Sequence, residues 1–196
     1  MHALEIRRNG VTVAVVGASN ALMFSADIAA SIQDETATLD IRGMNELGNE
    51  RQSHTVWLEL EPLAEGDKIE LSFVEVAAAT PPKEEVATDS PEYQAGQAEY
   101  EAQLQAEPLA PRVLEQRRPD AGLRLTVPGH DGIVATLESG QEFLSCRFLW
   151  NRWRPEQCRV SLSSFSQEEA IARSGSREWF NGVLSPGEKC VVKVGA

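Results

Sequence analysis

The chain has 196 residues, 42% of them hydrophobic, and a formal net charge of −12 from 18 basic and 30 acidic side chains. This length allows one large or two small domains, each able to bury a core. The charge argues against nucleic acid as the main partner, because phosphate binding needs a basic surface. It permits a basic protein partner, and it also fits an acidic surface that serves only solubility.

Three features predict a cytoplasmic protein. The cysteines Cys146, Cys158 and Cys190 are odd in number and form no CxxC pair, which fits a reducing compartment. The N-terminal residues lack the apolar core of a secretory signal. No run approaches the roughly 18 apolar residues of a membrane span. We therefore expect no disulfide and no membrane partner.

The first 76 residues are typical of successive short β-strands. Asn9-Gly10 separates two runs rich in β-branched residues, which is a strong hairpin signal. Residues 42–55 are polar and predict a loop. The candidate strands are residues 3–8, 11–16, 22–32, 36–41, 56–60 and 69–76. Short strands separated by turn signals predict a compact β-sandwich or barrel.

Residues 78–121 change character and predict a linker with one helix over about residues 91–106. Ser90 is a good N-cap, Pro91 suits the first helical position, and Glu92 places an acid in the first turn. The apolar face of this helix is narrow, so we expect it to dock weakly on a β-domain.

From residue 123 the pattern of the first segment returns, at an offset of 119 to 122 residues. The matching blocks, all in the same order, are 4–6 with 123–125, 13–14 with 134–135, 24–26 with 144–146, 39–41 with 160–162, 57–58 with 179–180, and 63–68 with 184–189. Trp57 and Trp179 become equivalent. We predict an all-β fold of two tandem, duplicated small β-sandwich or barrel-like domains, residues 1–77 and 122–196, joined by the linker 78–121.

The sequence contains no recognisable catalytic or metal-binding motif. There is no nucleophile elbow, P-loop or HExxH motif. The three histidines lie far apart, without metal-ligand spacing. Residues 129–132, Gly-His-Asp-Gly, have a catalytic-looking composition, but they match the Asn9-Gly10 turn and favour a plain hairpin turn. We predict no catalytic residue, metal site or cofactor.

The most unusual stretch is residues 143–162, two β-prone runs around a polar break at 151–156, which predict a hairpin. Cys146 and Cys158 lie symmetrically about Arg152, so we expect them to face each other across the strands. They fit a redox pair, two metal ligands, or two small buried apolar residues.

The tip of this hairpin is the predicted binding site. It gathers Trp150, Arg152, Trp153 and Arg154, and tryptophan and arginine are enriched at binding hot spots. The alternatives are a core position for Trp150 with solvated or ion-paired arginines, or a grip on single-stranded nucleic acid, which the net charge opposes.

Charge differs sharply between the segments. Residues 1–77 carry 5 basic and 13 acidic side chains, net −8, residues 78–121 carry 4 and 9, net −5, and residues 122–196 carry 9 and 8, net +1. The stretch of the first segment that matches the arginine-rich hairpin holds Asp27, Asp34 and Glu35, which we add to the predicted partner-binding residues. The two segments are therefore expected to contact different surfaces, including each other or a second copy in a homo-oligomer.

These observations predict a non-catalytic, cytoplasmic protein-binding protein of bacterial character. The most concrete hypothesis is an immunity protein that neutralises a toxin, with an acidic surface that would steer association with a basic one. The alternative is an assembly adaptor or self-associating module, and an enzyme of unrecognised type is the third hypothesis.

Overall fold

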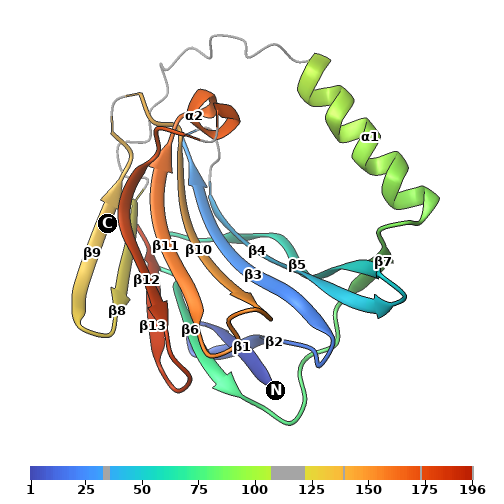
Figure 1. The fold of residues 1–196 in the computed structure, drawn as a ribbon. Helices are drawn as coiled ribbons and strands as arrows, with labels where there is room; N and C mark the ends of the chain where they lie inside the picture. Colours follow the sequence, from blue (N-terminus) through green and yellow to red (C-terminus); the bar gives the residue numbers. More distant parts are fainter. Residues whose placement is uncertain (33–35, 107–121, 139, 173, 196) are drawn as a thin grey trace.

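The computed structural model describes residues 1–32, 36–106, 122–138, 140–172 and 174–195. Within them the chain forms two antiparallel sheets around one hydrophobic core, which confirms the all-β class (Figure 1). Strands alternate inward and outward residues, as half-buried strands do. In the strand at 143–151, for example, Leu144, Cys146, Phe148 and Trp150 are buried.

The six-stranded sheet has the order β2-β1-β6-β13-β8-β9, with β1 His2–Arg8, β2 Val11–Val16, β6 Lys68–Glu75, β8 Gly122–Val127, β9 His130–Thr136 and β13 Lys189–Val194. The seven-stranded sheet has the order β12-β11-β10-β3-β4-β5-β7, with β3 Ala21–Ser31, β4 Ala37–Gly48, β5 Arg51–Leu63, β7 Glu84–Ala87, β10 Phe143–Asn151, β11 Cys158–Phe165 and β12 Arg177–Leu184.

The two segments predicted as tandem domains share both sheets and the core. β6 pairs with β13 in one sheet, and β3 pairs with β10 in the other. Counted outward from these junctions, β6-β1-β2 on one side corresponds in order to β13-β8-β9 on the other, and β3-β4-β5 corresponds to β10-β11-β12. This arrangement differs from two sandwiches with separate cores, because pairing at the junctions satisfies backbone groups that separate domains would leave on open edges. The duplication itself stays a prediction.

The junction of the six-stranded sheet is closed by reciprocal backbone hydrogen bonds. The Gly66 amide donates to the Val194 carbonyl over 2.9 Å, and the Gly187 amide donates to the Phe73 carbonyl over 2.7 Å. Both glycines have a positive φ, 88° and 89°, a conformation that other residues adopt at a cost. The turn before the last strand of each segment thus caps a strand of the other segment.

The predicted loop at residues 42–55 is wrong. These residues continue β4 and begin β5, with a tight turn at Asn49-Glu50 where both residues have positive φ. The inward positions here hold Asn45, Ser53 and Thr55, all buried. Because small and polar residues replace the usual apolar ones, the sequence lacks the alternation that predicts a strand.

The linker helix is confirmed as α1, Pro91–Ala106. The Ser90 hydroxyl accepts a hydrogen bond from the Tyr93 amide over 3.2 Å, as an N-cap does. Figure 1 shows α1 attached at the end that follows β7 and standing apart from the sheets. Near that end the Tyr93 ring lies beside the His54 ring of β5, with centroids 6.0 Å apart.

Two elements were not predicted. β7 pairs with β5 although it begins with two glutamates, Glu84 and Glu85. The short helix α2, Gln167–Ala172, begins with a capping box in which the Ser166 hydroxyl accepts from the Glu169 amide and the Glu169 carboxylate accepts from the Ser166 amide. That Ser-x-x-Glu signal is visible in the sequence. Neither described helix is long and apolar enough to cross a bilayer.

Candidate functional site

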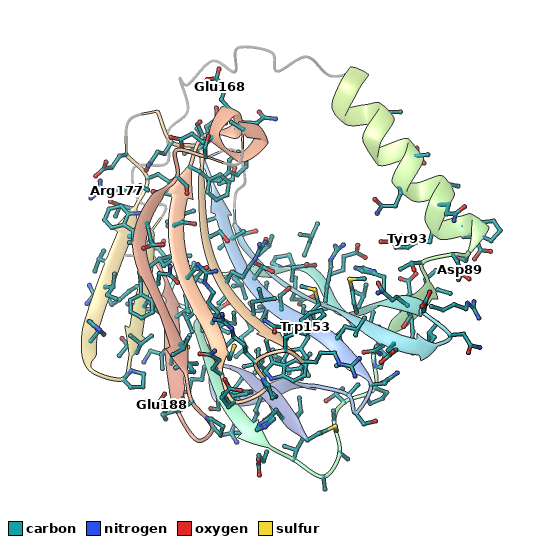
Figure 2. The ribbon with its side chains drawn as sticks, viewed as in Figure 1. Asp89, Tyr93, Trp153, Glu168, Arg177 and Glu188 are labelled. Carbon is teal, nitrogen blue, oxygen red and sulfur yellow. The ribbon has the colours of Figure 1, made fainter. Side chains whose placement is uncertain are left out.

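The β10–β11 hairpin forms as predicted, and its tip is held in one geometry by backbone hydrogen bonds. The Trp153 amide donates to the side-chain oxygen of Asn151 and the Arg154 amide to its carbonyl, both over 3.2 Å. The Arg152 amide donates to the Leu22 carbonyl over 2.9 Å, which ties the tip to the start of β3. Trp153 is 73% exposed on this ordered turn (Figure 2).

Trp150 belongs to the core and not to the contact surface, so its predicted place in the partner-binding set is corrected. It is only 6% exposed and stacks on Phe24 with ring centroids 4.7 Å apart. Its indole N–H donates to the Pro155 carbonyl over 3.1 Å. The reason is strand parity: Trp150 lies an even number of residues from Phe148, which also points inward.

The arginines of the hairpin differ in how far they are already engaged. Arg147 pairs with Asp27 and Arg152 with Glu46, while Arg159 donates to Asn181 over 3.1 Å. Arg154 is exposed, and among the described residues its guanidinium has no ion pair. Arg154 is therefore the cation of the tip that remains available to a partner.

The predicted acidic residues are not gathered at the tip. Asp27 has a side chain only 17% exposed and is occupied by Arg147 across the β3–β10 junction. Asp34 and Glu35 lie outside the described residues. An acid from another strand that does reach the tip is Glu46 near the end of β4, which sequence reasoning missed because residues 42–55 were expected to form a loop.

The expected pairing of Cys146 with Cys158 is wrong. Cys146 lies opposite Leu162, and Cys158 lies opposite Trp150, because the hairpin register is centred on Arg154 and not on Arg152. Burial raises the pKa of Cys158 to about 12, and it also raises the pKa of Cys146 and of Cys190. Buried thiols that keep their protons are poor nucleophiles and poor metal ligands, so all three are best described as small core residues.

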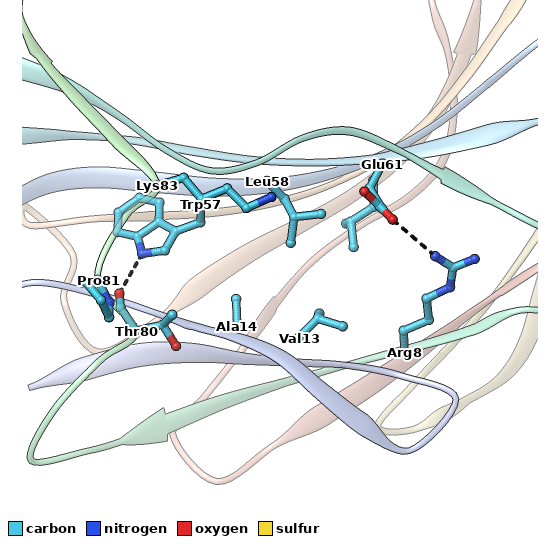
Figure 3. Close-up of a pocket in the computed structure, with 10 residues that line it drawn as sticks. Arg8, Val13, Ala14, Trp57, Leu58, Glu61, Thr80, Pro81 and Lys83 are labelled. Carbon is cyan, nitrogen blue, oxygen red and sulfur yellow. Dashed lines mark hydrogen bonds and ion pairs between the residues drawn. The ribbon is translucent and has the colours of Figure 1, made fainter.

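A cavity of about 290 Å³ opens at the end of the sandwich built by the first segment, between β2 and β5 (Figure 3). It is partly covered by the segment after β6, residues 77–83, which we call the strap. The lining consists of the apolar Val13, Ala14, Leu39, Trp57, Leu58 and Pro81, with Arg8, Glu61, Thr80 and Lys83 as polar members.

The strap is hydrogen-bonded to both sheets. On the β2 side, the Thr80 amide donates to the Val15 carbonyl over 2.8 Å, and the Val15 amide donates to the Thr80 hydroxyl over 2.9 Å. On the β5 side, the Lys83 amide donates to the Val56 carbonyl, and the Trp57 indole N–H donates to the Thr80 carbonyl, each over 2.8 Å. The strap therefore bridges β2, at the edge of one sheet, and β5 of the other sheet, and it lies across the cavity.

The charged groups around the cavity differ in whether they already have an ion-pair partner. Arg8 donates two hydrogen bonds to one carboxylate oxygen of Asp67, at 2.9 and 2.6 Å, and lies 3.8 Å from Glu61. Burial works to raise the pKa of Asp67, but hydrogen bonds from Asn9, a backbone amide and Arg8 together lower it. Lys83 has no ion pair within the described part of the chain, so it is the unengaged cation at the cavity.

Comparisons with other proteins and a search of the described residues for metal-binding clusters both gave no match. A scan against protein-family models and searches of curated proteins and of solved structures found no match to this chain. Among the described residues, no group of three or more histidine, cysteine or acidic side chains is placed to hold a metal ion.

Proposed function

We propose that this chain is a non-catalytic protein-binding protein that contacts its partner through Trp153 and Arg154 at the β10–β11 tip. The observation that supports this is the exposure of Trp153, 73%, on a turn whose backbone is fixed by three hydrogen bonds. A large aromatic ring left in water gains little for folding. Placed on an ordered surface, it can enter a partner's pocket at little further cost in conformational entropy.

Arg154 can add directional hydrogen bonds to the apolar contact that Trp153 makes. Its guanidinium is exposed, and it can donate two parallel hydrogen bonds to a carboxylate or to backbone carbonyls of a partner. Arg152 is less available, because its ion pair with Glu46 would have to be exchanged. We therefore expect the partner to present an apolar pocket for the indole, with acceptor oxygens beside it.

The finer proposal is an immunity protein that neutralises a toxin. Its support is the net charge of −12, which would accelerate encounter with a basic toxin while the tip provides the short-range contacts. The competing proposal, an assembly adaptor or self-associating module, would use the same exposed tip against a second copy of the chain.

The test uses a Trp153→Ala, Arg154→Ala double variant and the purified product of a neighbouring gene. We expect a 1:1 complex by native mass spectrometry, and an affinity loss in the double variant of about 30-fold, the equivalent of about 2 kcal/mol for one hot spot. The control is Val11→Ala, which removes another exposed apolar side chain on β2 and should leave affinity unchanged.

The outcomes separate the proposals. Unchanged affinity in a double variant with native circular dichroism would reject the tip as the binding site. Concentration-dependent oligomers of the chain alone, lost in the double variant, would favour self-association over a toxin partner.

A further inference from the structure

We propose that the cavity beneath the strap is a binding site for a small carboxylic acid with a single apolar ring. The cavity, about 290 Å³, lies at the lower end of ligand pockets, roughly 300–1,000 Å³, and so suits one ring better than a drug-sized molecule. Its apolar walls come from both sheets and from the strap. This inference concerns a surface separate from the hairpin tip and does not depend on the proposed function.

One wall of the cavity has a leucine where the second segment, in the predicted repeat, has a larger aromatic residue. In the predicted repeat, Leu58 matches Phe180. The Phe180 ring lies edge-on to His130, with centroids 5.6 Å apart, over Gly182, which has no side chain to obstruct it. At the first end Leu58 fills less space, and Figure 3 shows it facing Val13 across the cavity. A ligand ring would occupy volume that a protein ring occupies at the second end.

The charges favour an acid over an amine. Lys83 lines the cavity without an ion pair among the described residues, so its ammonium is available to a carboxylate. The Thr80 hydroxyl accepts from the Val15 amide, which leaves its own hydrogen free to donate. On the other side of the cavity, Glu61 lies 3.8 Å from Arg8. Glu61 would repel a ligand carboxylate, which is therefore expected near Lys83. A ligand amine would have to compete with Arg8 for Glu61.

The test titrates three molecules that share one ring and differ in charge: phenylacetate, phenylacetamide and phenethylamine. Binding to the full chain is followed by two-dimensional ¹H–¹⁵N NMR, with the indole N–H of Trp57 as reporter because its carbonyl partner is in the strap. We expect phenylacetate to bind with a Kd of about 1 mM, a usual value for so small a ligand. Phenylacetamide should bind about three- to fivefold more weakly, and phenethylamine more weakly still.

Two variants assign the contacts. Lys83→Gln should weaken phenylacetate to the level of phenylacetamide while leaving phenylacetamide unchanged. Leu58→Phe should fill the cavity and weaken both by more than about tenfold, as a ring competes for the same volume. Lys189→Gln removes an exposed ammonium at the start of β13 that does not line the cavity, so it is the matched control and should change nothing.

Each remaining outcome is decisive. The proposal is overturned if none of the three molecules shifts the Trp57 indole signal at 20-fold the expected Kd. It is also overturned if the amine binds as tightly as the acid, or if a folded Leu58→Phe variant keeps its affinity. Should Leu58→Phe fail to fold, Lys83→Gln still tests the site, because Lys83 is exposed and its side chain supports no core.

Discussion

The two ends of the sandwich each carry a tryptophan, at positions that the predicted repeat makes equivalent, and the two side chains lie in different environments. Trp57 at the first end is 4% exposed, and its N–H is bonded to the strap. Trp179 at the second end is half-buried, its N–H donates to the Ser164 hydroxyl over 2.8 Å, and the Arg177 guanidinium lies 3.9 Å from the centre of its ring. Trp57 is therefore a core residue that lines the cavity, whereas Trp179 is a half-buried residue at the surface.

One small residue accounts for much of this difference. A Cβ at Gly43 would lie 3.0 Å from Cζ3 of Trp57 and 2.9 Å from the Met23 carbonyl, so the ring can pack there only because position 43 has no side chain. In the predicted repeat Gly43 corresponds to Ser164 of β11, whose hydroxyl accepts a hydrogen bond from the Trp179 indole N–H. The residue beside each tryptophan thus acts differently: the glycine leaves room for the Trp57 ring, and the serine bonds the Trp179 N–H.

The largest expected effect on the free energy of unfolding comes from truncating the two tryptophans to alanine. Trp57→Ala should lower the free energy of unfolding by about 3–5 kcal/mol, because a fully packed ring is lost. Trp179→Ala should cost only about 1–2 kcal/mol, since its ring is partly hydrated and its cation–π contact is solvent-exposed. Urea unfolding of the two variants gives both values, and equal losses would contradict the proposed division of roles.

The three cysteines extend this comparison, because all lie in the second segment and the predicted repeat aligns them with apolar residues of the first. Cys146, Cys158 and Cys190 correspond to Ala26, Ala37 and Ile69 in the predicted repeat, and all six are buried. If the cysteines are only small core residues, replacing one by its counterpart should preserve the fold.

Cys158→Ala tests this through pH. Below pH 9 the thiol is protonated in both folded and unfolded chains, so pH has no effect through it. Above pH 9 the unfolded thiol ionises first, whereas burial holds the pKa of the folded thiol at about 12, so stability falls as pH rises between these values. The slope approaches about 1.4 kcal/mol per pH unit.

The wild-type chain should therefore lose about 2 kcal/mol more than Cys158→Ala between pH 8 and pH 10.5, measured by urea unfolding at each pH. A thiol reagent at pH 8 provides the control: it should react with three groups in urea and with none in the native chain. Parallel pH profiles for wild type and variant would show that Cys158 is not held protonated by the fold.

The smallest effect concerns the junction of the two segments in the seven-stranded sheet. Asp27 and Arg147 are opposite each other in the β3–β10 pair, and each follows the matched block of its own segment. Since the Arg147 side chain is 58% exposed, solvent screens the pair, and Arg147→Asp should cost only about 0.5–1 kcal/mol.

The swapped double variant, Asp27→Arg with Arg147→Asp, should recover most of that loss, because the pair is restored in reverse. Thermal unfolding at low and high salt checks both variants, and the difference between them should shrink at 1 M salt. No recovery in the swapped variant would show that the loss comes from packing at the junction and not from charge.

Local patterns in the sequence were enough to predict the all-β class, helix α1 and the hairpin at 143–162. Asn9-Gly10 needs positive φ and so marks a turn, Ser90-Pro91 marks a helix start, and alternating side chains mark strands, all through interactions a few residues apart. The same patterns predict a loop at residues 42–55, which is wrong, because the buried polar residues Asn45, Ser53 and Thr55 break the apolar alternation of a strand.

The tertiary structure decided everything that depends on which distant residues meet. The cavity combines residues of β1, β2, β4, β5 and the strap, and no local pattern records that these approach one another. Likewise, Trp150 and Trp153 look alike in the sequence, yet strand parity buries one and a fixed turn exposes the other. The sharing of sheets at β6–β13 and β3–β10 has the same cause: edge strands pair with whatever complementary edge the folded chain brings beside them, and that is a property of the whole chain.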